Sequence, residues 1–161
     1  MRIDKAKLLK LLRLDVEKAL AVMTQAAKAA HDAATHPENK PENDKDTRGL
    51  EASYLAGAQS KRAAELAKTL QALNGLVPRA FKATDTVAAT ALVRIEVDET
   101  ESVVFICPFG AGLKASLGGV DIQVITPQSP LGDAVLGRKV GDAFEVQVAG
   151  RVREVRIVSV D

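Results

Sequence analysis

Four carboxylates lie within nine residues in the most polar stretch of this sequence, residues 38–46. They belong to Glu38, Glu42, Asp44 and Asp46, and two lysines in the same stretch leave it a formal charge of −2. Carboxylate oxygens suit a hard divalent cation, and Mg²⁺ often takes only one or two of them, with water and substrate phosphates as its other ligands. The spacing and the glycine of a calcium-binding EF-hand loop are absent. The stretch is therefore suited to complete a metal site that belongs to another molecule, and a solvated polar turn is the alternative.

Two helical patterns flank the acidic stretch and would position it. Residues 4–34 and residues 47–74 both carry small or apolar residues at heptad spacing. The predicted seam positions are Leu9, Leu12, Val16, Ala19, Met23, Ala26, Ala30 and Ala33, and then Ala52, Ala56, Gln59, Ala63, Leu66, Leu70 and Leu73. Pro37 and Pro41 disfavour one continuous helix across the polar stretch. We predict an antiparallel coiled-coil hairpin over residues 1–74 with an acidic tip, an ordinary pair of bundle helices being the alternative.

The helical residue pattern ends at Asn74-Gly75 and Pro78, which together form a helix-stop signal. Beyond it, residues 86–97, 102–108, 120–126, 142–148 and 152–158 are β-branched runs, and several of them alternate apolar with polar residues. Such alternation predicts an antiparallel sheet with one solvated face. A short helix is expected over residues 130–136. The fold class is thus α+β, with a second domain at residues 80–161, and Cys107 in an apolar run is predicted to be a buried core thiol.

Composition excludes several classes of function. The chain of 161 residues has a net charge of +1, 3% aromatic residues and no tryptophan, so a nucleic-acid surface built on stacking aromatics is not expected. No apolar run reaches the length of a membrane span, and the single cysteine fits a reducing compartment. We expect a monomeric cytoplasmic protein. Residues 110–116 resemble a phosphate loop but do not match its pattern, so they are interpreted as a hairpin loop.

The histidines and the basic N-terminal end are the remaining candidates for binding. His31 and His36 lie five residues apart, roughly 140° around a helix, so they are not expected to share a metal. Lys5, Lys10 and Arg13 belong to a basic patch at the end opposite the acidic tip. Such a patch could contact a nucleic-acid backbone in a salt-sensitive, sequence-independent way, and a solvated helix face is the alternative.

Residues 126–158 carry a more specific pattern. It runs Ser129-Pro130, an aliphatic residue, a short helix, a stretch similar to Leu-x-Gly-Lys and an acidic loop before two strands. Over roughly residues 85–160 this pattern resembles the C-terminal domain of the GreA/GreB transcript cleavage factors. The helical hairpin and the order of the two parts also fit that family. Glu42-Asn43 resembles the Glu-Asn of the family tip, and residues 44–55 look like a divergent Gre-like branch.

The resemblance implies an FKBP-like C-terminal fold and a transcription elongation factor that inserts its hairpin into the secondary channel of bacterial RNA polymerase. There Glu38, Glu42 and Asp44 would assist the polymerase active site in cutting backtracked nascent RNA. Glu38 and Glu42 would hold an Mg²⁺ ion shared with the polymerase, which the isolated protein would not bind stably. The residues implied to dock on the channel rim are Ser129, Pro130 and Leu131. By itself the factor would be no enzyme, because the polymerase performs the cleavage.

Departures from the family pattern keep other hypotheses open. Asn39 stands three residues before Glu42, where the family has an aspartate, and Asp133 stands where the Ser-Pro motif commonly has an arginine. A second hypothesis is therefore a regulator that occupies the channel without stimulating cleavage. A third is a peptidyl-prolyl isomerase, but the second domain has only four phenylalanines with which to line a proline pocket. A fourth is an oligomerising coiled coil, against which the alanine seam argues because alanine buries little area.

Overall fold

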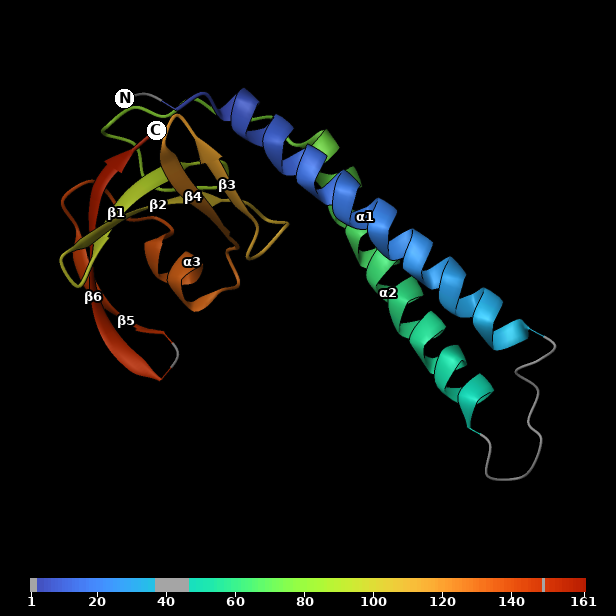
Figure 1. The fold of residues 1–161 in the computed structure, drawn as a ribbon. Helices are drawn as coiled ribbons and strands as arrows, with labels where there is room; N and C mark the ends of the chain where they lie inside the picture. The colour runs from blue at the N-terminus through green and yellow to red at the C-terminus, as the bar shows by residue number, and fades with distance from the viewer. Residues whose placement is uncertain (1–2, 37–46, 149) are drawn as a thin grey trace. The chain divides into compact units, whose positions relative to one another are not determined.

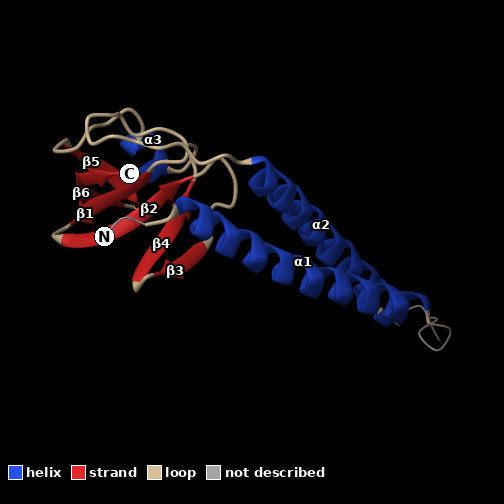
Figure 2. Cartoon of the chain, turned by 90° about the horizontal axis from the view of Figure 1, so that it is seen from above, coloured by secondary structure: helices blue, strands red, loops and turns tan. Residues whose placement is uncertain are grey.

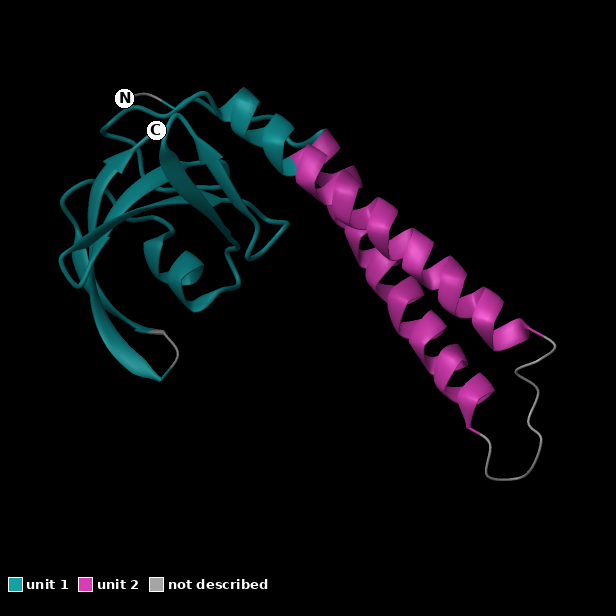
Figure 3. Ribbon diagram, in the orientation of Figure 1, with its two compact units in different colours: residues 1–12, 75–161 teal, residues 13–74 magenta. Residues whose placement is uncertain are grey.

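The structure is a computed structural model that describes residues 3–36, 47–148 and 150–161. It divides into two compact units (Figure 3): residues 13–74, and residues 1–12 together with residues 75–161. The helices lie at the start of the chain and the strands follow, so the α+β fold class predicted from the sequence is confirmed. Among the described residues, no helix combines the length and the apolar character that a membrane crossing requires.

Two long helices provide the first unit. Helix α1 spans Lys5–Thr35 and helix α2 spans Arg48–Gly75, each within one residue of its predicted limits. The Asp4 carboxylate caps α1, because its Oδ1 accepts hydrogen bonds from the backbone N–H groups of Ala6 at 2.9 Å and Lys7 at 3.1 Å. From residue 13 onward α1 runs antiparallel to α2 (Figures 1 and 2).

The predicted heptad seam lies between the two helices. Every predicted seam residue of α2 is buried or half-buried, and so is every one of α1 except Ala33, which is exposed. At one end, the Arg13 guanidinium donates two hydrogen bonds, of 3.0 and 2.8 Å, to the Leu73 carbonyl. Toward the other end, Ala30 and Ala56 are the buried residues. Their small side chains let the helices approach closely, as a narrow hairpin requires.

Six strands form one sheet in the second unit, in the order β3-β4-β2-β1-β6-β5. The strands are β1 Leu92–Val97, β2 Thr100–Ile106, β3 Lys114–Leu117, β4 Val120–Ile125, β5 Ala143–Val148 and β6 Arg151–Val160. Four of the five pairings are antiparallel, as predicted, but β2 and β4 pair in parallel. The exception arises because an extra strand, β3, lies between β2 and β4 in the sequence, where the sequence analysis expected a loop. The chain turns at Gly118-Gly119 after β3, so that β4 pairs with β3 antiparallel and with β2 in parallel.

One face of this sheet curves around a short helix (Figure 1). Helix α3 spans Pro130–Val135, and its apolar side chains pack on the core formed by β1, β2, β5 and β6. The first strand begins at Leu92 rather than at residue 86, because residues 83–90 form turns that end at Thr90, with a φ of 68°. Cys107 is fully buried, which confirms the predicted core thiol, and this burial raises the pKa of the thiol.

Candidate functional site

The acidic tip falls in the connection between α1 and α2. Glu38, Glu42 and Asp44 lie outside the described residues, so their proposed roles rest on the sequence. In the part of the chain that the structure describes, no three or more His, Cys, Asp or Glu side chains are grouped to hold a metal ion. In the sequence, the acidic stretch joins the end of α1 at Thr35 to the start of α2 at Arg48.

The basic residues predicted to contact nucleic acid are not gathered into one free surface. Lys5 Nζ donates to the carbonyls of Arg79 at 2.7 Å and Thr90 at 3.1 Å, and it lies 4.6 Å from the centre of the Phe81 ring. Arg13 is engaged with α2, as described above, and Lys10 is exposed. Two of the three cations therefore hold the fold together, and a role in binding nucleic acid stays a prediction.

Ser129 caps helix α3 and uses its hydroxyl within the domain. The Oγ atom accepts a hydrogen bond from the Gly132 N–H at 3.1 Å and donates one to the Thr126 carbonyl at 2.8 Å. Pro130 follows at the first helical position, where its missing N–H leaves no intrahelical bond unmade, and its side chain is exposed. Of the three residues predicted to dock on a partner, Ser129 thus serves to position the other two.

Gly132 is a residue of this turn that the sequence analysis did not identify. A Cβ atom at this position would lie 1.9 Å from the Thr126 carbonyl oxygen, far inside van der Waals contact. Only glycine therefore lets α3 close against the end of β4, the arrangement that Ser129 also stabilises. The available signal was a glycine within a predicted helix, which usually has a packing or functional reason.

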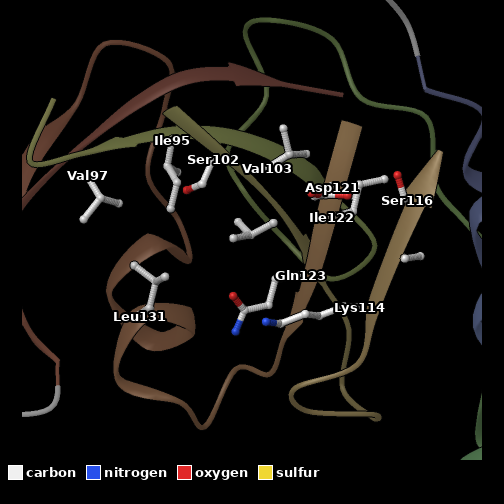
Figure 4. Close-up of a pocket in the computed structure, with 12 residues that line it drawn as sticks. Ile95, Val97, Ser102, Val103, Lys114, Ser116, Asp121, Ile122, Gln123 and Leu131 are labelled. Atoms are coloured by element: carbon white, nitrogen blue, oxygen red, sulfur yellow. The ribbon is translucent and has the colours of Figure 1, made fainter. Parts of the chain in front are cut away.

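Leu131 points into a cavity of about 500 Å³ on the open part of the same sheet face (Figure 4). Apolar side chains of its lining come from Ile95 and Val97 of β1, Val104 of β2 and Leu131 of α3. Ile95 and Val104 belong to the buried core, whereas Val97 and Leu131 are partly exposed. The cavity is therefore a continuation of the core that solvent can reach.

Polar side chains line the cavity as well. They are exposed and belong to Ser102, the cross-strand neighbour of Ile95, and to Lys114, Ser116, Asp121 and Gln123 of β3 and β4. Within the described part of the chain these side chains have no hydrogen-bond or ion-pair partner. Apolar lining residues with a few free polar groups among them are typical of a site that receives an aliphatic group and fixes its orientation. None of the twelve lining residues is aromatic, unlike the lining expected of a proline pocket.

We expect Ser129→Ala to lower the stability of the domain by about 1 kcal/mol, the usual effect of removing an N-cap side chain. Both hydrogen bonds of the hydroxyl are lost, and the Gly132 N–H is left without its cap. Urea denaturation followed by circular dichroism measures the change. Ser129→Thr is the matched control, because a threonine hydroxyl can both accept from the Gly132 N–H and donate to the Thr126 carbonyl. An unfolding midpoint unchanged in Ser129→Ala would contradict the structural role of this hydroxyl.

A comparison with protein-family models found one match. The model of the family described as transcription elongation factor GreA/GreB, C-terminal domain, matches residues 82–161. Among solved structures, GreA factor homolog 1 (Gfh1) of Thermus thermophilus is 19% identical, covers 92% of this chain and 94% of its own, and has a TM-score of 0.38. Thermus aquaticus Gfh1 is 18% identical, with 91% of each chain covered and a TM-score of 0.38. GreA/GreB from Nitrosomonas europaea is 25% identical over 59% of this chain and 78% of its own, with a TM-score of 0.35. No curated protein has significant similarity to the chain.

Proposed function

Because the chain belongs to the GreA/GreB family of transcription elongation factors as a divergent Gre-like member, we propose that it binds bacterial RNA polymerase and stimulates cleavage of backtracked nascent RNA. The observation that carries the proposal is the family match over residues 82–161. The hairpin adds support, since α1 and α2 have 31 and 28 residues, about 47 and 42 Å at 1.5 Å per residue. Helices of that length suit insertion into the secondary channel.

The acidic tip is proposed to act at the polymerase active site. Glu38 and Glu42 would supply oxygen ligands to an Mg²⁺ ion shared with the polymerase, and Asp44 would add negative charge beside them. In such sites a divalent cation activates water and stabilises the oxygens of the displaced phosphate. The polymerase performs the cleavage, and the chain contributes carboxylates, so it is not itself an enzyme in this proposal.

The C-terminal domain is proposed to dock on the rim of the channel. Leu131 and the cavity beside it offer apolar side chains with unpartnered polar groups next to them, a combination suited to an aliphatic side chain on a protein surface. Pro130 is exposed next to this wall. Docking through Pro130 and Leu131 would leave Ser129 to hold the turn.

One observation favours a second candidate function. Asn39 stands where the family tip carries an aspartate, and Lys40 and Lys45 reduce the negative charge of the stretch. A tip with fewer correctly spaced carboxylates would hold a metal ion less well. The chain could then occupy the channel as a regulator without stimulating cleavage.

RNA cleavage in a stalled, backtracked bacterial elongation complex separates the two candidates. At millimolar Mg²⁺, we expect addition of this protein to shorten the transcript from its 3′ end, because the tip would complete the metal site. If the transcript is not shortened but cleavage by an added GreA factor is blocked, the chain is a channel-occupying regulator. The absence of both effects would contradict both functions.

A further inference from the structure

The cavity beside Leu131 has two charged side chains in its lining, opposite in sign and on neighbouring strands. Among the described residues that form this lining, only Lys114 of β3 and Asp121 of β4 are charged. Both are exposed, and within the described part of the chain neither forms an ion pair with the other or with a third residue. A cation and an anion are therefore both available to a ligand that enters the cavity.

The strand register places a neutral polar side chain next to each charge. Lys114 is the cross-strand partner of Gln123, and Ser116 is the partner of Asp121, so all four side chains lie on one face of the sheet (Figure 4). The Lys114 ammonium and the Gln123 amide can both donate hydrogen bonds to one carboxylate. The Asp121 carboxylate and the Ser116 hydroxyl can both accept hydrogen bonds from one ammonium.

The apolar lining restricts the rest of the ligand. Ile95, Val104 and Leu131 are all branched aliphatic residues, and the lining has no aromatic ring on which a flat ligand could stack. The cavity volume of about 500 Å³ falls within the range of roughly 300–1,000 Å³ that is usual for small-molecule sites. The lining therefore suits a small ligand with a short aliphatic chain and two opposite charges.

We propose that this cavity binds a free α-amino acid with a branched aliphatic side chain, for which leucine is the probe. Its carboxylate accepts hydrogen bonds from Lys114 and Gln123, its ammonium group donates to Asp121, and its side chain contacts Leu131. A simple carboxylate would leave Asp121 unpaired, and a simple amine would leave Lys114 unpaired, so the zwitterion makes the most charge-assisted hydrogen bonds. The inference goes beyond the proposed function, because this binding needs no polymerase.

Titration of the isotopically labelled full-length protein with leucine, followed by two-dimensional NMR, tests the proposal. We expect saturable shifts of backbone amide signals concentrated in β3, β4 and α3. Two analogues keep the branched chain: 4-methylpentanoate lacks the ammonium group of leucine, and 3-methylbutylamine lacks its carboxylate. Each should bind about tenfold more weakly than leucine, because each loses the hydrogen bonds to one charged side chain.

Substitutions assign the two charges to the two ends of the ligand. Lys114→Gln should weaken leucine binding about tenfold and reduce the preference for leucine over 3-methylbutylamine, and Asp121→Asn should do the same relative to 4-methylpentanoate. A residue that only supported the fold would not change these preferences selectively. Lys61→Gln is the matched control, because it removes the same charge from an exposed position of α2, and it should bind leucine as the wild type does.

Two results would overturn the proposal. One is the absence of saturable shifts in β3 and β4 with leucine, and the other is binding of 4-methylpentanoate or 3-methylbutylamine as tightly as leucine. Both measurements use the protein without polymerase, so either result leaves the proposed function standing. Failure of the chain to bind polymerase would in turn leave the leucine titration unchanged.

Discussion

Replacing Glu38 and Glu42 together by alanine should reduce stimulated RNA cleavage by about 100-fold or more while polymerase affinity stays close to that of the wild type. The loss follows because even the outer-shell partners of metal ligands cost about 10–100-fold when mutated, and here both proposed ligands are removed. Binding should persist because the helices and the C-terminal domain, which carry the proposed docking residues, are untouched. Transcript shortening in a backtracked complex measures activity, and displacement of a labelled wild-type chain measures binding.

The charge of the two carboxylates can be separated from their size. Glu38→Gln with Glu42→Gln keeps the shape of the side chains, so it should lose cleavage as the alanine variant does, and raised Mg²⁺ should restore part of the loss by mass action. Asp46→Asn is the matched control, because it removes one charge from the same acidic stretch at a position without a proposed metal contact. Cleavage that survives in the alanine variant would remove Glu38 and Glu42 from the metal site.

The hairpin could be predicted closely because its signal is local and repeated. The same spacing of small and apolar residues recurs in each heptad of α1 and α2. Chance matches at single positions therefore have little effect on the predicted helix limits. Ala33 is the one predicted seam residue of the two helices that is exposed, and it lies two residues before the end of α1. Helix ends were marked by residues that disfavour helix, the prolines at 37 and 41 and the Asn74-Gly75 pair.

The sheet and the cavity on it depend on pairings between strands that are distant in the sequence. Such pairings are harder to predict from local residue patterns than helices are. The Gly118-Gly119 turn, with φ angles of 62° and 77°, is a recognisable hairpin signal that would have identified β3, yet it does not reveal that β4 pairs with β2. Asp121 and Gln123 alternate with apolar residues along β4, which indicates a polar face but not the cavity that this face lines. Leu131 was found through the family pattern, and its apolar neighbours came only from the fold.

Gly132→Ala should lower the free energy of unfolding by about 3 kcal/mol, as overpacking a closely fitted site can. The added methyl group would lie 1.9 Å from the Thr126 carbonyl oxygen and 2.8 Å from its carbon, and both are backbone atoms that cannot rotate away. Helix α3 would have to move off the end of β4, which would also break the Ser129 hydroxyl bonds. Urea denaturation of the full-length wild type and variant, each followed by circular dichroism, gives the change in the free energy of unfolding.

Gly57→Ala is the matched comparison, because it is the same substitution at a helical glycine with open space around it. Alanine is favoured over glycine within a helix by up to about 1 kcal/mol, so this variant should be as stable as the wild type or more stable. The two substitutions should therefore change stability in opposite directions, since one adds a clash and the other adds only helix propensity. Equal or raised stability in Gly132→Ala would mean that α3 does not close on the Thr126 carbonyl, and the cavity wall that Leu131 provides would have to be placed differently.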